Sequence, residues 1–223
     1  MLRYAILLPL LAATVLGQTK PNIIFFLTDD LGYGDVGCFW QDQRGNPKKF
    51  DTPALDTMAA EGAKLTQHYV AASVCAPSRA SLLQGRHQGH CDVRNNQFDK
   101  ALPNTTHGLA FALKAAGYRT IHIGKDGLSG GEGSVNLSGT GSQNLESHPL
   151  SRGFDRFFGY LFHADGHEHY PRNGSTSKSA YIYDNYQRIS NASPDLYTTD
   201  AWTAAAKKEI TTAAGANQPF FLY

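Results

Sequence analysis

A continuous apolar run near the start of the chain constrains its fold more than any other feature. Ile23 to Leu27 are five apolar residues in a row, and Asp29 and Asp30 follow almost directly. An unbroken run of this length is typical of a strand buried on both faces of a sheet. Such a strand needs a layer of helices on each side, so the run predicts an α/β protein.

The rest of the chain alternates in the same way. Helices are predicted where an apolar segment starts at a capping residue and stops at glycine or alanine: Thr52 to Gly62, about Thr106 to Ala116, and about Thr199 to Ala214. Strands are predicted at Arg119 to Ile123 and in the apolar run Pro219 to Tyr223. This order predicts a central, largely parallel sheet flanked by helices. Two segments rich in Gly, Ser and Asn, Gly127 to His148 and Arg172 to Asn191, are predicted to be surface loops or insertions.

Composition excludes several classes of protein. The chain has 223 residues, enough for one large domain or two small ones, and a net charge of +1. A balanced charge argues against general nucleic-acid binding, which needs a clustered basic surface. The 3 cysteines are too few for a small disulfide-stapled scaffold.

The N-terminus predicts the compartment. Arg3 precedes an apolar run from Tyr4 to Leu16, and small residues lead up to Gly17. Residues 1–17 are therefore predicted to be a signal peptide, too short to span a bilayer, and no later segment is long enough for a membrane span. We expect a protein of the secretory pathway, either secreted to the extracellular space or held in a lysosome-like compartment. Glycosylation sequons agree with this at Asn104, Asn136, Asn173 and Asn191.

Asp29 and Asp30 are candidate metal ligands. Ligands of open α/β sheets bind at the carboxyl ends of the strands, which is where these residues lie. Adjacent carboxylates repel each other unless a cation neutralises them, and a hard ion such as Ca²⁺ or Mg²⁺ suits them. The alternative is a solvated acidic turn.

A second candidate site surrounds Cys75. Pro77 suits the first turn of a helix and Gly85 its end, so Cys75 lies at or just before a helix N-terminus, where unpaired N–H groups favour an anion. Arg79 lies one turn further and can hold an oxyanion through two hydrogen bonds. Taken alone, this spacing also describes a buried structural cysteine, and it differs from that of cysteine-dependent phosphatases.

The complete element Cys75-Ala76-Pro77-Ser78-Arg79, with Leu82 and Gly85, resembles the signature of the type I, formylglycine-dependent sulfatases of the alkaline-phosphatase-like superfamily. Further segments resemble that family in the same order, and the likeness runs from Pro21 to Tyr223: Thr28 to Asp35, Thr52 to Asp56, Gly85 to Asn95, Gly117 to Lys125, Arg152 to Gly159, and Pro219 to Tyr223. The resemblance implies that residues 21–223 form the N-terminal catalytic domain. It also implies that the domain is incomplete, because related enzymes carry a later Asp-Asn pair, a His and a Lys.

The resemblance also implies a reaction. Cys75 would be oxidised to Cα-formylglycine by a formylglycine-generating enzyme. One hydroxyl of the hydrated aldehyde would attack the sulfur of a sulfate ester, and the second would then expel sulfate. Ca²⁺, or Mg²⁺, would be held by Asp29, Asp30 and residue 75, while Arg79 holds the hydrate and Lys125 neutralises sulfate oxygens. The substrate would be an aryl sulfate or a sulfated glycan.

Some positions depart from the family pattern or remain open. Gln84 stands where Thr or one of a limited set of other residues is usual in the signature, and Asp126-Gly127-Leu128-Ser129 replaces Trp-His-Leu-Gly after Lys125. His167 and His169 lie in a segment that resembles a histidine-rich part of the substrate pocket, so a substrate contact is predicted for His167; a structural role or zinc binding are the alternatives. Cys38 and Cys91 are a candidate disulfide pair.

Two rival functions follow from the same residues. A phosphatase or phosphodiesterase of the superfamily would carry Thr or Ser in place of Cys75. A truncated, non-catalytic sulfatase-like protein would instead bind sulfated ligands without turnover.

Overall fold

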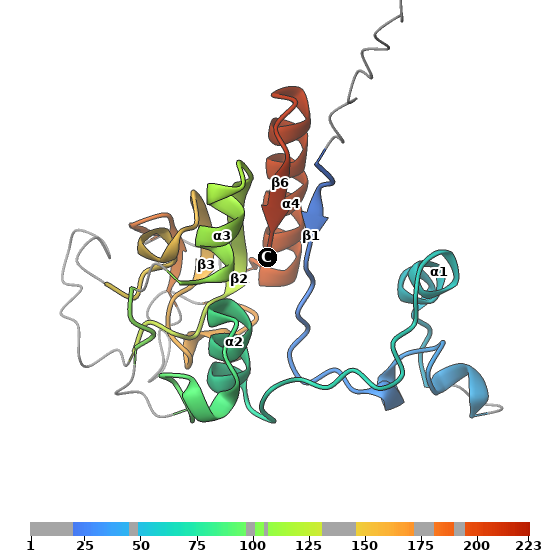
Figure 1. Ribbon diagram of the computed structural model, residues 1–223. Coiled ribbons are helices and arrows are strands. Elements are labelled where there is room, and N and C mark those ends of the chain that lie inside the picture. The colour runs from blue at the N-terminus through green and yellow to red at the C-terminus, as the bar shows by residue number, and fades with distance from the viewer. Residues whose placement is uncertain are drawn as a thin grey trace, which may run out of the picture.

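The chain forms a six-stranded mixed sheet with helices on both faces (Figure 1). The computed structural model describes residues 20–44, 49–96, 101–104, 107–130, 146–171, 181–189 and 195–223, so the predicted signal peptide and the sequons at Asn136, Asn173 and Asn191 lie outside it. The strand order is β1-β6-β2-β3-β4-β5. The pairings among the first four strands are parallel, and the pairings of β3 with β4 and of β4 with β5 are antiparallel, which confirms the largely parallel sheet. The strands are β1 Ile23–Ile24, β2 Arg119–Lys125, β3 Arg156–Tyr160, β4 Ile182–Asp184, β5 Gln187–Ile189 and β6 Phe220–Leu222.

Helices α2 and α3 cover one face of the sheet and α4 covers the other (Figure 1). Short 3₁₀ turns connect the larger elements. Within the described residues, no helix is both long and apolar enough to cross a membrane. The helices are α1 Pro53–Glu61, α2 Cys75–Gln84, α3 Leu109–Ala115 and α4 Thr198–Gly215, and the turns are η1 Tyr33–Asp35, η2 Gln41–Gln43, η3 Gln88–His90, η5 Pro149–Arg152 and η6 Asp165–His167.

Strand β6 explains why its sequence is apolar at every position. Phe221 and Tyr223 pack with residues of α2 and α3, whereas Phe220 and Leu222 pack against the α4 side. Successive side chains of a strand point to opposite faces, so both faces of β6 are buried and neither requires polar residues. The predicted terminal strand is confirmed.

The predicted helices are confirmed with shifted ends. α4 begins one residue before the predicted start and ends one residue after the predicted end, and α3 is shorter than predicted. Thr52 holds the N-cap position of α1, but its hydroxyl does not cap the helix. That hydroxyl accepts a hydrogen bond from the Gly37 amide at 2.8 Å instead.

The first predicted strand is shorter and far more exposed than its sequence suggested. β1 lies at an edge of the sheet and pairs with β6 alone, so nothing among the described residues covers its other edge. Phe26 is 76% exposed and Ile24 is 44% exposed. The prediction of a strand buried on both faces is therefore wrong for this chain.

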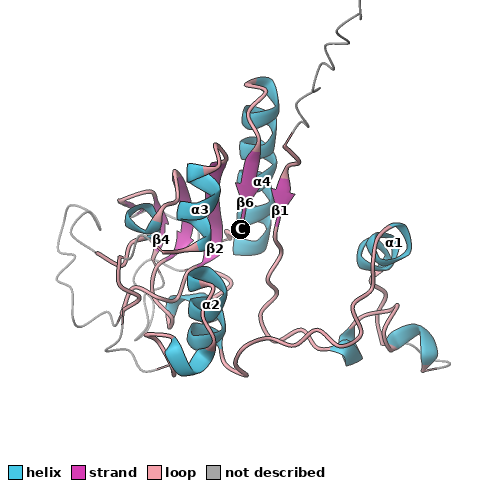
Figure 2. Cartoon of the chain, viewed as in Figure 1, coloured by secondary structure: helices cyan, strands magenta, loops and turns pink. Residues whose placement is uncertain are grey.

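Residues 33–44 and 49–69, which we call the arm, extend away from the sheet with α1 at the far end (Figure 2). Val36 is the buried hydrophobic residue of its described part, and α1 buries none of its side chains. Large apolar side chains of the arm are exposed instead, among them Met58, Leu65 and Tyr69. The arm thus has no hydrophobic core of its own.

Both predicted loop segments contain ordered structure. Strands β4 and β5 form a hairpin within the second segment, and Asn185 at its turn has a φ of 52°, a left-handed conformation that asparagine tolerates. In the first segment, Leu128 and His148 are fully buried. The loop prediction is wrong at these positions; residues 131–145 and 172–180 lie outside the described part.

Candidate functional site

Four of the predicted site residues meet at the carboxyl ends of the parallel strands. Asp29 follows β1, Lys125 ends β2, and Cys75 and Arg79 lie in the first turns of α2. Val74, the N-cap residue, has an extended backbone, so α2 begins at Cys75. The helix ends at Gln84, because Gly85 adopts a left-handed conformation with a φ of 63°. Parallel strands place their carboxyl ends at one edge, so the fold itself brings these distant residues together.

The carboxylate of Asp29 is the centre of the cluster. Lys125 Nζ donates a hydrogen bond to Asp29 Oδ2 at 2.8 Å, and an Arg79 nitrogen lies 3.5 Å from the same oxygen. The Cys75 thiol lies 3.5 Å from Asp29 Oδ1. Partial burial alone would raise the pKa of Asp29, but the hydrogen bond and charge of Lys125, with the charge of Arg79, outweigh it and lower that pKa. Asp29 is therefore ionised throughout the neutral range.

Arg79 is a buried charged residue that is fixed by hydrogen bonds. Its side chain is buried, and one terminal nitrogen donates to the Lys125 carbonyl at 2.8 Å and to the Tyr223 hydroxyl at 3.2 Å. Its Nε is buried without a hydrogen-bond partner among the described residues. A buried guanidinium that keeps one donor without a partner is suited to holding an oxyanion.

Asp30 lies next to this cluster rather than in it. Its φ of 57° places the backbone in the left-handed region, which is uncommon for a residue with a side chain and is often found at functional sites. Asp29, Asp30, Cys75 and Arg79 together line a cavity of about 180 Å³.

The carboxylates of Asp29 and Asp30 are the type of ligand that a hard cation binds. Carboxylate oxygens are the ligands that Ca²⁺ and Mg²⁺ prefer. The number of ligands is small, however: the described residues contain no cluster of three or more His, Cys, Asp or Glu side chains with metal-binding geometry. Two carboxylates and residue 75 fall short of the roughly six to eight oxygens of a Ca²⁺ site.

His167 lies on the turn η6, which packs over Lys125. Its Nε2 is 3.4 Å from Nε2 of His163, a residue that sequence reasoning missed because no motif marks it. The pKa of His163 is lowered by burial and by the nearby charge of Lys125. The turn fits tightly, since a Cβ at Gly166 would lie 2.4 Å from Lys125 Cδ. His167 thus contacts a histidine neighbour of Lys125, whereas a substrate contact remains a prediction.

Gln84, Cys38 and Cys91 make their contacts outside the Asp29 cluster. The Cys91 thiol donates to the Gln84 side-chain oxygen at 3.1 Å, and Gln84 donates to Asp92 at 2.6 Å. Cys38 lies in the arm, beside α1, where its amide donates to Asp56 at 2.7 Å. All the cysteines fall within the described residues and all are free thiols, so the candidate disulfide is not formed in this structure.

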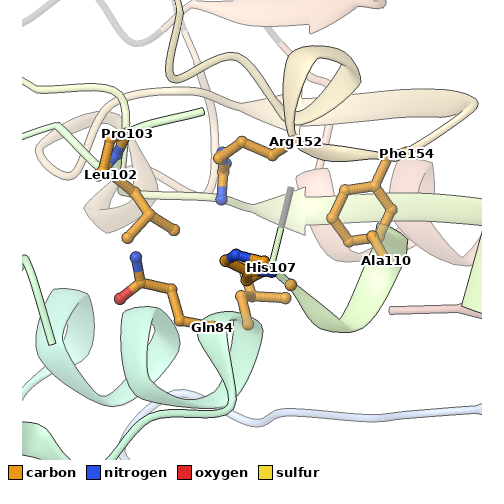
Figure 3. Close-up of a pocket in the computed structure, with 9 residues that line it drawn as sticks. Gln84, Leu102, Pro103, His107, Ala110, Arg152 and Phe154 are labelled. Carbon is orange, nitrogen blue, oxygen red and sulfur yellow. The ribbon is translucent and has the colours of Figure 1, made fainter. Parts of the chain in front are cut away.

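Two further cavities are found among the described residues, one beside the cluster and one away from it. A groove of about 550 Å³ runs beside it, lined among others by Phe25, Lys125, Tyr160 and Trp202. A small void of about 20 Å³ lies between α2 and α3, and Figure 3 shows Arg152 extending into it toward Gln84. The void has room for about one water molecule, while the groove is large enough for a small organic group.

Comparison with known proteins identifies the family. The family model described as Sulfatase matches residues 21–223. Steryl-sulfatase of Mus musculus is 42% identical over 148 residues, which are 62% of this chain and 22% of that protein. Arylsulfatase G of Homo sapiens is 32% identical over an alignment that covers 97% of this chain and 43% of that protein.

Solved structures agree. The crystal structure of Ps i-CgsB has a TM-score of 0.70 and 27% sequence identity, with coverage of 92% of this chain and 44% of that one. BT4656, solved with its substrate D-glucosamine-2-N,6-O-disulfate, has a TM-score of 0.66 and 25% identity, with coverage of 91% and 33%. The chain therefore spans less than half the length of each of these relatives.

Proposed function

Because the chain belongs to the sulfatase family and has its alkaline-phosphatase-like fold, we propose that it carries the nucleophile end of a site that hydrolyses sulfate esters. One observation supports this most: Cys75, Arg79 and Lys125 converge on Asp29 although they come from separate elements. A structural cysteine would not require two cations and an ionised carboxylate around it. The arrangement matches a nucleophile that must form and release an anionic group.

Cys75 would be converted to Cα-formylglycine by a formylglycine-generating enzyme. One hydroxyl of the hydrated aldehyde would attack sulfur and break its bond to the ester oxygen, which leaves as the alcohol. Loss of the proton from the second hydroxyl would then re-form the aldehyde C=O and break the C–O bond to sulfate. The structure supports two roles for the chain's own residues. Arg79, fixed by the Lys125 carbonyl and Tyr223, would hold an oxygen at position 75, and the Lys125 ammonium would bind the sulfate oxygens.

Asp29 and Asp30 would hold the divalent cation, Ca²⁺ or Mg²⁺, with position 75. When bound, the cation supplies positive charge that stabilises oxygen anions. In this structure Lys125 Nζ donates a hydrogen bond to Asp29 Oδ2 at 2.8 Å. When the cation binds Asp29, Lys125 would exchange this contact for one with the substrate. His167 would contact the substrate from η6, and the substrate would be an aryl sulfate or a sulfated glycan.

Sulfated-ligand binding without turnover is a second candidate. The small number of metal ligands in the described residues favours it. We further propose that the chain enters the secretory pathway through residues 1–17 and is glycosylated, with Asn104 as a described and exposed sequon position.

The test is peptide mass spectrometry of the protein expressed in a host that contains the formylglycine-generating enzyme, together with hydrolysis of a chromogenic aryl sulfate. The proposal predicts an aldehyde at position 75, while Cys38 and Cys91 remain thiols in the same digest. An unmodified Cys75 would overturn the catalytic proposal. A modified Cys75 with no turnover at saturating Ca²⁺ would favour the binding protein.

A further inference from the structure

Asp126 directly follows Lys125 and is an unusually placed charge. Its side chain is fully buried, and it forms an ion pair with Arg152, whose side chain is 5% exposed. The second carboxylate oxygen accepts hydrogen bonds from the Leu128 amide and the Ser129 hydroxyl, both at 3.3 Å. Burial raises the pKa of Asp126, while the charge of Arg152 and these hydrogen bonds oppose that rise.

This pair fixes the main chain around Lys125. The Asp126 amide donates to the Tyr160 carbonyl at 2.8 Å, which continues the β2–β3 ladder by one residue. The chain then turns at Gly127, whose φ is 67°. Arg152 is itself held in place, since its Nε donates to the Ser147 carbonyl at 2.8 Å while a terminal nitrogen pairs with Asp126.

The same short segment carries two functional contacts of the site. The Lys125 side chain, 8% exposed, reaches Asp29, and the Lys125 carbonyl accepts from Arg79. Any shift of the turn at residues 125–128 would therefore move an ammonium and a guanidinium together.

Other charges near Asp126 do not replace Arg152. His122 Nδ1 lies 3.7 Å from Asp126, but burial lowers the pKa of His122 far below its usual value, so the imidazole is neutral. Removing one partner of a buried pair leaves an uncompensated charge that the surrounding structure must rearrange to accommodate.

We propose that Asp126 and Arg152 are a positioning pair for the proposed reaction, which hold the turn after Lys125 so that Lys125 and Arg79 face residue 75. The inference rests on the proposed function for its kinetic consequence, but its structural consequence can be measured without any turnover. It assigns a role to the position where this chain departs from the Trp-His-Leu-Gly pattern. Neither residue touches the substrate, so neither is a catalytic residue.

The first experiment compares the Asp126→Asn variant with wild type. We expect kcat for an aryl sulfate to fall at least about tenfold, because a displacement near 1 Å can cost about a hundredfold in rate. We also expect Lys125 to react at least about fivefold faster with an amine-acylating reagent, measured by peptide mass spectrometry against the exposed Lys207, because a buried, paired ammonium is freed.

Glu209→Gln is the matched control. Glu209 is a buried carboxylate on α4 that pairs with Arg119 and Arg156, outside the candidate site. The Glu209→Gln variant should lower the midpoint of urea unfolding, as is expected for Asp126→Asn, but should leave kcat and the Lys125 acylation rate unchanged. Arg152→Lys keeps the charge without the planar fork, and it should give intermediate values of both quantities; it also replaces Asp126→Asn if that variant does not fold.

Two results would overturn the proposal. One is a variant of the pair that loses stability while Lys125 acylation stays at the wild-type rate. The other is a Glu209→Gln variant that changes Lys125 acylation as much as the pair does. If the wild-type chain hydrolyses no sulfate ester, the acylation rates still decide, so failure of the proposed function is distinguishable from failure of the pair.

Discussion

Mild acid should destabilise this protein through its buried His148. The imidazole is fully buried; its Nδ1 accepts from the Leu150 amide at 3.1 Å and its Nε2 faces the Asn185 carbonyl at 3.1 Å. These partners require the neutral ring with hydrogen on Nε2. Burial, aided by the charge of Arg152 and opposed by the Asn185 contact, lowers the pKa of His148 from 6.5 to about 4.

The sign follows from proton binding. Between pH 6.5 and pH 4 the unfolded chain binds a proton at His148 and the folded chain does not, so the free energy of unfolding falls as the pH falls. The full shift is worth about 3 kcal/mol, of which about 2 kcal/mol is lost by pH 5. His122 acts in the same direction, because burial lowers its pKa well below the usual value.

The assay is urea unfolding followed by tryptophan fluorescence at several pH values from 7.5 to about 5, where most ordinary carboxylates are still ionised. His148→Asn can still accept from the Leu150 amide but cannot titrate. We expect it to be less stable at pH 7.5 and to lose about 2 kcal/mol less than wild type between pH 7.5 and pH 5. His90→Asn, at an exposed histidine, should keep the wild-type pH dependence. Equal pH dependence in wild type and His148→Asn would refute the reasoning.

Three further substitutions test the site and the sheet. Lys125→Met should lower kcat/KM for an aryl sulfate by about a hundredfold or more, since a positive charge on the sulfate oxygens is lost; a change under threefold would remove Lys125 from the proposed site. Arg79→Lys should lower kcat by about tenfold with little loss of stability, because the planar donor fork is lost while the charge stays; wild-type kcat would show that the fork is not needed. Gly159→Ala should destabilise the fold by at least about 3 kcal/mol in urea unfolding, because its Cβ would lie 1.8 Å from the Gly124 carbonyl oxygen of the paired strand. The control is Gly215→Ala, whose Cβ would meet no atom within 4 Å, so this variant should be neutral or stabilising. Equal stability of the two glycine variants would contradict this packing.

The sequence predicted the elements that local rules determine. Pro77 and Gly85 set the ends of α2 through backbone preference alone, and the apolar run of β6 follows from burial on both faces. The same rules placed Asp29 and Lys125 at strand ends, so their meeting at one edge of a parallel sheet could be expected.

Burial of β1 and the polar network could not be predicted in the same way. The run Ile23 to Leu27 is apolar whether or not a neighbour covers it, so its exposure depends on strand order rather than on its own residues. Asp126 and Arg152 are separated along the chain, and no spacing rule joins a residue after β2 to one in η5. The β4–β5 hairpin is short and polar on β5, so it carried no strand pattern.

The central claim is that residue 75 is the nucleophile and that its second hydroxyl releases sulfate. The Cys75→Ser variant tests both parts, because serine has a hydroxyl for attack but no second hydroxyl for release. After incubation with an aryl sulfate and Ca²⁺, peptide mass spectrometry should find one sulfate group bound to position 75, with no turnover beyond the first cycle. Continued turnover by this variant, or sulfate bound at another residue while position 75 stays free, would contradict the account.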